Sequence, residues 1–203
     1  MQDKSLYNLN TATLDSALST NKVLKNTYML LGMTLLFSAV TAGISMAIGL
    51  PQGAALILAL VGFGLLFVVN RTADSSKGLI AIFAFTGVMG ASIGPMLKYY
   101  LAMPGGPALV MQALGGTALV FFGLSAYALT TRKDFSYMGG FLMVGLLVAV
   151  VAMIANIFLA IPALSLTISA AVVMIMSGLI LFDTSRIING GETNYIRATV
   201  SLY

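Results

Sequence analysis

Six apolar runs constrain this chain more than any other feature, because each has the length of about 20 residues that a helix needs to cross a bilayer. Short connections rich in Pro, Gly and small polar residues, which are turn residues, separate them. A membrane barrel would need strands of about 10 residues with alternating polarity, and the runs are continuously apolar. The sequence therefore predicts an all-α integral membrane protein with six transmembrane helices, at residues 27–49, 53–70, 79–102, 108–130, 137–160 and 163–185.

Polar segments flank this transmembrane domain, which we assign to residues 27–188. In residues 1–26 no apolar core follows the early lysine, so the segment does not have the pattern of a cleaved signal peptide. We interpret it as a flexible tail. The domain prediction is thus a tail, a six-helix membrane domain and a C-terminal loop over residues 189–203.

The C-terminal loop predicts a further helix. Asn189, Gly190 and Gly191 should end the sixth span, because glycine accepts the left-handed geometry of a helix cap. The sequence becomes apolar again from Ala198 and stops at Tyr203. We therefore expect a seven-helix bundle whose last helix is missing from this chain.

Positive charge predicts the orientation. Nine of the ten Lys and Arg residues fall on one side of the six spans, and only Lys98 falls on the other. The nine are Lys4, Lys22, Lys25, Arg71, Lys77, Arg132, Lys133, Arg186 and Arg197. Because cytoplasmic loops carry the excess of Lys and Arg, the N-terminus is predicted to be cytoplasmic.

Composition excludes several functions. The chain is 59% hydrophobic and 8% charged and has no Cys and no His, so thiolate chemistry and the commonest general base are absent. The net charge of +4 forms no basic face, so nucleic acid is not an expected partner. No GxSxG, HExxH or phosphate-loop motif is present. We expect no enzymatic activity, no cofactor and no metal site, with the lipid bilayer as the surroundings.

Asp183 is an acid near the cytoplasmic end of the sixth span, about 30 Å along that helix. It is either an interfacial carboxylate, solvated or paired with Arg186 one turn later, or an inward-facing group of a cation or proton site. A lone carboxylate binds Ca²⁺ poorly, because that ion takes six to eight oxygen ligands. A partner acid would have to follow Tyr203.

Span three carries Gly87, Gly90 and Gly94 on nearby faces, and the last two form a GxxxG spacing that lets helices approach closely. Pro95 follows and should kink the helix. Close packing against a neighbouring helix is the first interpretation, and a hinge beside a pore is the second.

Asn156 is a polar residue inside span five, toward its outer end. An interhelical hydrogen bond is the expected role, because an amide in a membrane helix needs a partner. Ion coordination is the alternative.

Four stretches of the sequence resemble a known family. They read "NKVLKNTYMLLGMTLLFSA", "LGGTALVFFGLSAYALTTRKDFSYMGG", "ANIFLAIPALSLTISA" and "ILFDTSRIINGGETNYIRATVSLY". They are similar to the Bax-inhibitor (transmembrane Bax inhibitor motif) family, and most closely to its bacterial YccA branch. The resemblance covers the chain from about residue 19.

This resemblance implies seven helices, with the seventh inside a ring of six, in the bacterial inner membrane. Some family members leak Ca²⁺ in a pH-dependent way through paired aspartates on helices six and seven, and Asp183 matches the helix-six member. The YccA branch is associated instead with the membrane AAA protease FtsH, as its substrate and modulator, together with the HflK/HflC complex. The resemblance thus implies an FtsH modulator, with a cation leak as the alternative. From its polar residues, the N-terminal tail of residues 1–26 is the segment that we expect the protease to engage.

Overall fold

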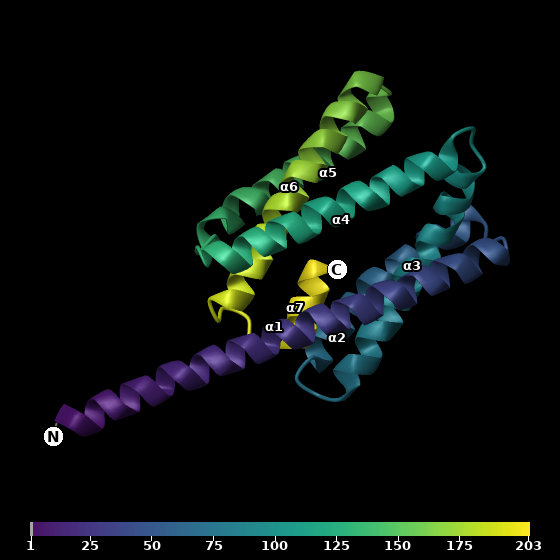
Figure 1. Ribbon diagram of the computed structural model, residues 1–203. Coiled ribbons are helices and arrows are strands. Elements are labelled where there is room, and N and C mark those ends of the chain that lie inside the picture. Colours follow the sequence, from purple (N-terminus) through teal and green to yellow (C-terminus); the bar gives the residue numbers. More distant parts are fainter. Residues whose placement is uncertain (1) are drawn as a thin grey trace. The chain divides into compact units, whose positions relative to one another are not determined.

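The computed structural model describes the backbone of residues 2–203 and the side chains of residues 20–203 (Figure 1). That part of the chain is helical and contains no strand. Within residues 20–203, six helices are long and apolar enough to cross a membrane, which confirms the predicted fold class. In chain order the elements are α1 (Gln2–Ala47), α2 (Gln52–Thr72), α3 (Lys77–Leu101), α4 (Gly106–Thr131), the 3₁₀ turn η1 (Ser136–Met138), α5 (Gly139–Leu159), α6 (Pro162–Ile188) and α7 (Tyr195–Leu202).

The first helix is longer than the first predicted span. α1 begins at Gln2, and the part of it that is suited to cross a membrane is Thr20–Ala47. The side chains before Thr20 lie outside the described residues, so the tail proposed for residues 1–26 remains a prediction.

The chain forms two compact units. One holds the chain up to Gly116 together with Glu192–Tyr203, and the other is Thr117–Gly191. In the first unit α3 packs against α1 and α2, and the short α7 contacts all three (Figure 1). In the second unit α5 and α6 pair as a hairpin, with η1 packed against both.

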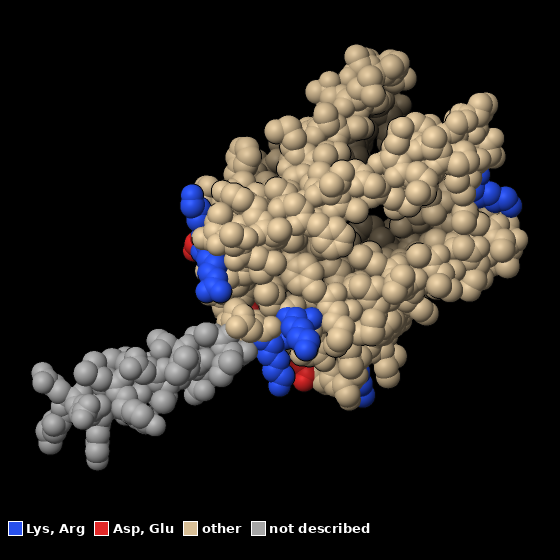
Figure 2. All heavy atoms as spheres, in the orientation of Figure 1, with Lys and Arg blue, Asp and Glu red and all other residues tan. Residues whose placement is uncertain are grey.

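Buried apolar side chains form the core of the first unit, at the helix ends that the positive charges predict to be cytoplasmic. The core residues are Leu30, Val69, Ala73, Ala81, Ile82, Phe85 and Ile196. Many of the other large apolar side chains are exposed. Figure 2 shows that few charged groups lie on the face that it presents. Lipid solvates such a surface, so helix association depends on close packing and interhelical hydrogen bonds rather than on hiding apolar area from water.

The predicted glycine cap ends α6. Gly190 has a φ of 75°, its N–H donates to the Ile187 carbonyl at 3.3 Å, and the Gly191 N–H donates to the Arg186 carbonyl at 2.8 Å. These two bonds satisfy carbonyls that a helix end otherwise leaves free. The next helix, α7, begins at Tyr195 because Asn194 caps it. This start is three residues before Ala198, where the sequence becomes apolar again.

The Gly190→Ala variant should unfold more readily than the native chain. A Cβ in the left-handed region costs about 1–2 kcal/mol. Gly191→Ala is the matched control, because Gly191 has no positive φ and its added Cβ would approach no atom closer than 3.4 Å. The measurement is the thermal unfolding midpoint in mild detergent, and equal midpoints for the two variants would contradict this account of the cap.

Candidate functional site

The glycines of α3 allow it to lie directly on α1. A Cβ built on Gly90 would overlap the Ser38 carbonyl oxygen, and one on Gly94 would lie 2.8 Å from the Ala42 carbonyl oxygen. Both partners are backbone atoms, which cannot move without separating the helices. We call this contact, formed by Ser38, Ala42 and Ser45 of α1 with Gly90 and Gly94 of α3, the α1–α3 seam.

Two hydroxyl groups of α1 bond to α3 backbone across the seam. Pro95 has no N–H, so the Ala91 carbonyl four residues earlier loses its helical partner. The Ser45 hydroxyl donates to that carbonyl at 2.7 Å. The Ser38 hydroxyl donates to the Thr86 carbonyl at 3.0 Å. The structure thus places Pro95 where α1 supplies the missing hydrogen bond, and a hinge role for the glycines and Pro95 remains a proposal.

Gly87 lies at the edge of this contact, against an aromatic side chain. An added Cβ would lie 2.6 Å from the Phe37 ring, which packs edge-on against Phe83 with 5.6 Å between ring centroids. An apolar groove opens there, lined by Phe37 and Thr41 of α1 and by α3 residues between Leu79 and Val88.

Asn156 connects α5 and α6 at their turn. Its amide nitrogen donates to the Ser165 hydroxyl at 2.6 Å, and its side-chain oxygen accepts from the Ile161 N–H at 3.2 Å. Ala160, between the two helices, has a left-handed φ of 51° and donates its N–H to the Asn156 carbonyl at 2.8 Å. These bonds give Asn156 a role in holding the hairpin.

Asp183 lies half-buried on α6, followed by the fully buried hydroxyl residues Thr184 and Ser185. The Arg186 guanidinium lies 5.6 Å from the centroid of the Phe182 ring, a cation–π distance. Over residues 20–203 no group of three or more His, Cys, Asp or Glu side chains gathers at a potential metal site. An ion-binding role for Asp183 therefore remains a proposal.

Ser185 was not among the residues that the sequence indicated. Its hydroxyl donates to the Lys133 carbonyl at 3.1 Å and accepts from the Phe135 N–H at 2.9 Å, so it fastens the α4–α5 connection to α6. In that connection the hydroxyl and backbone N–H of Ser136 bond to Asp134 and hold its pKa below the usual value. This loop is therefore organised by hydroxyl groups and one ionised carboxylate.

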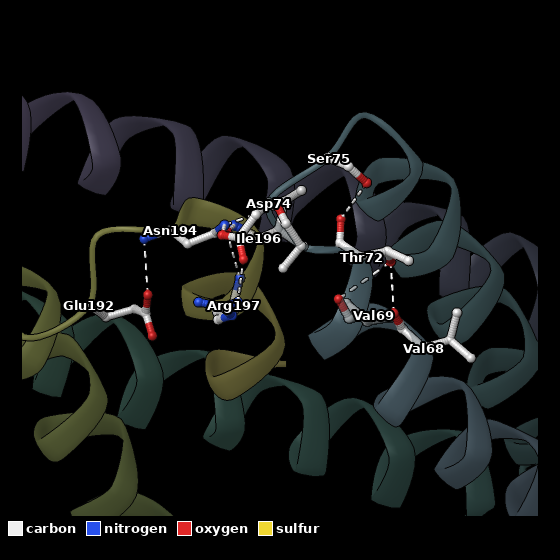
Figure 3. A network of polar contacts seen from close by, with 10 residues as sticks. Val68, Val69, Thr72, Asp74, Ser75, Glu192, Asn194, Ile196 and Arg197 are labelled. Atoms are coloured by element: carbon white, nitrogen blue, oxygen red, sulfur yellow. Dashed lines mark hydrogen bonds and ion pairs between the residues drawn. The ribbon is translucent and has the colours of Figure 1, made fainter.

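A polar cluster joins the start of α7 to the α2–α3 connection (Figure 3). Asn194 caps α7, because its side-chain oxygen accepts from the N–H groups of Ile196 at 2.8 Å and Arg197 at 3.2 Å. Its amide nitrogen donates to the Ala73 carbonyl at 2.9 Å and to an Asp74 oxygen at 2.8 Å. All four hydrogen-bonding positions of the amide are used.

Arg197 completes this cluster, which we call the cytoplasmic clasp (Asp74, Asn194 and Arg197). Its guanidinium lies 2.6 Å from the other Asp74 oxygen, with the two side chains 39% and 69% exposed. An ion pair so accessible to water contributes about 1 kcal/mol or less. Asn194 is therefore the main element of the clasp. Asn before an apolar helix start is a capping signal that the sequence does contain.

These features define a class: a multi-pass helical membrane protein in which several polar side chains form helix contacts and caps. Within that class, the chain belongs to the family described as "Inhibitor of apoptosis-promoting Bax1", whose sequence profile matches residues 20–203. This confirms the resemblance found in the sequence.

Several bacterial relatives are similar over nearly the whole chain. "Modulator of FtsH protease YccA" of Escherichia coli K12 is 59% identical over 189 residues, which cover 93% of this chain and 85% of the relative. A second Escherichia coli relative with the same identity is named "Inner membrane protein YccA". An uncharacterized membrane protein of Vibrio cholerae is 52% identical, over 95% of this chain and 87% of the relative. The chain is accordingly an inner-membrane protein, as predicted.

Removing the Asn194 side chain should destabilise the first unit more than removing the Asp74 charge. Asn194→Ala loses a helix cap, which costs about 1 kcal/mol, together with the bonds to the α2–α3 connection. Asp74→Asn loses an exposed ion pair but keeps a side-chain oxygen that can accept from the Asn194 amide. Asn70→Ala is the control, since the exposed Asn70 bonds only within α2, to the Leu66 carbonyl. The measurement is the thermal unfolding midpoint of each variant in mild detergent. A larger drop in the midpoint for Asp74→Asn than for Asn194→Ala would contradict the expected order.

Proposed function

We propose that this chain modulates the membrane AAA protease FtsH, is also its substrate, and has no enzymatic activity of its own. The observation that carries the proposal is the 59% identity, over 93% of the chain, to a protein named as a modulator of that protease. The absence of His and Cys is consistent with a regulatory rather than a catalytic protein.

The N-terminal tail is the proposed handle. A AAA protease has to grip a polar segment outside the membrane before it can pull a substrate out. Residues 1–26 provide such a segment on the cytoplasmic side, with a reach of roughly 85–90 Å when extended.

The α1–α3 seam gives a physical reason for slow extraction. Residues 2–26 of the tail form the first part of α1 itself, so a force on the tail acts on α1 first. α1 can leave only if the Ser38 and Ser45 bonds to α3 break and the close contacts at Gly90 and Gly94 separate. If the Ser45 bond breaks within the bilayer, the Ala91 carbonyl has no water to replace the lost hydrogen bond. A substrate that resists extraction occupies the protease and thereby modulates its action on others.

The HflK/HflC complex is a proposed companion of this assembly. The proposal rests on the resemblance to the YccA branch, and it predicts that both proteins accompany FtsH when this chain is isolated from native membranes.

FtsH reconstituted with the full chain in proteoliposomes tests the proposal. Deleting residues 2–19, which leaves the Thr20–Ala47 span intact, should abolish degradation without lowering the unfolding midpoint. Ser45→Ala should instead speed degradation several-fold, because it weakens the α1–α3 seam. Ser177→Ala is the matched control, since the Ser177 hydroxyl bonds only to Val173 of its own helix. Unchanged turnover of the shortened chain, or equal turnover of the two serine variants, would contradict the mechanism.

A cation or proton leak at Asp183 is the second candidate. The observation that favours it is the neighbouring Thr184 hydroxyl, which is fully buried and has no hydrogen-bond partner. A buried hydroxyl without a partner is costly and is expected where a ligand or water binds.

The leak predicts that Asp183→Asn lowers Ca²⁺ or proton flux into liposomes at least tenfold relative to the native chain. Asp134→Asn is the control, because Asp134 lies on the exposed α4–α5 connection. Equal flux through the Asp183→Asn variant and the native chain would exclude this candidate.

A further inference from the structure

The apolar groove beside Gly87 has a volume of about 630 Å³ and runs along α3 from Leu79 to Val88. On the α1 side the groove is bounded by Phe37, which is 40% exposed. On the α3 side it is lined by Ala84 and Gly87, whose small size leaves the space open. The groove is therefore an open, apolar depression on the surface of α1 and α3, formed entirely within the first unit.

The groove occupies one leaflet. At 1.5 Å per residue, the stretch from Leu79 to Val88 is about 13 Å long, roughly half of the ~30 Å hydrocarbon core. It lies in the first half of α3 (Lys77–Leu101). The positive-charge pattern places the start of α3 on the cytoplasmic side. A partner helix crossing the membrane would need a contact surface through both leaflets, whereas a lipid tail needs only one.

A lysine lies at the cytoplasmic rim of the groove. Lys77 precedes the groove residues Ile80 and Ala84 by three and seven positions, so all three share one face of α3. Helical side chains lean toward the N-terminus, which directs Lys77 to the membrane surface. Its side chain is exposed, and over residues 20–203 the structure records no ion pair for it. The neighbouring acid, Asp74, pairs with Arg197.

We propose that this groove binds an anionic phospholipid of the cytoplasmic leaflet. One acyl chain lies against Ala84 and Gly87, and the phosphate group is bound by Lys77. Charge complementarity selects this occupant, because an apolar recess with an unpaired cation at its interfacial end matches an acyl chain joined to an anionic headgroup.

Native mass spectrometry of the full chain in mild detergent tests this, with phosphatidylglycerol and phosphatidylcholine as the two probes. One lysine near the surface should favour the anionic lipid about fivefold. Lys77→Gln should remove this preference and leave phosphatidylcholine binding unchanged. Lys98→Gln, which removes the same charge from the other end of α3, should retain the preference.

Filling the groove gives an independent readout. Ala84→Phe should lower the binding of both lipids, and Ala84→Leu should lower it less, while neither presses on the core because Ala84 is exposed. Ala118→Phe, at an exposed position of α4 outside the groove, is the control. Equal binding of the two lipids by the native chain, or identical behaviour of the Lys77 and Lys98 variants, would overturn the proposal. So would groove-filling variants that bind lipid normally but lose a co-purifying membrane protein, since a partner helix would then occupy the groove.

Discussion

A backbone carbonyl within the bilayer must find its hydrogen bond inside the protein, and the first unit depends on how that requirement is met at Pro95. Proline removes the N–H that the Ala91 carbonyl would accept, and the Ser45 hydroxyl of α1 supplies the replacement at 2.7 Å. Gly94 makes the bond possible, because any Cβ there would meet the Ser45 side chain and the Ala42 carbonyl. Pro95 therefore frees the carbonyl that Ser45 binds, and Gly94 leaves the space that Ser45 needs. Together they hold α1 and α3 in direct contact.

The cytoplasmic half of the same unit is built around α7. Ile196 lies in the apolar core, the Thr199 hydroxyl donates to the Thr27 carbonyl at 3.3 Å, and the Tyr203 hydroxyl lies 2.6 Å from that of Ser38. Residues from the end of the chain thus bond to α1 at the level of the core and of the seam. A force applied at the N-terminus acts against both sets of contacts, and this links the fold to the proposed resistance to a pulling protease.

Sequence patterns predicted the features that depend on local residues and missed those that depend on distant pairing. Span lengths follow from bilayer thickness, the α6 end from Gly190, and the close approach of α3 to a neighbour from the spacing of Gly90 and Gly94. Ser45 could not be identified as the partner of Pro95, because 46 positions separate it from Ala91 and many membrane serines bond only to their own helix. The ion pair between Asp74 and Arg197 could not be predicted either, because the two residues are 123 positions apart. Their pairing follows from the position of α7, which tertiary packing determines.

Isolation of the tagged full chain from native membranes in a gentle detergent tests the central claim, that this protein acts on FtsH. FtsH should be recovered in near-stoichiometric amount together with HflK/HflC, and the chain lacking residues 2–19 should recover much less of it. Recovery of the chain with no FtsH, under conditions that keep FtsH bound to HflK/HflC, would show that this protein does not act on FtsH.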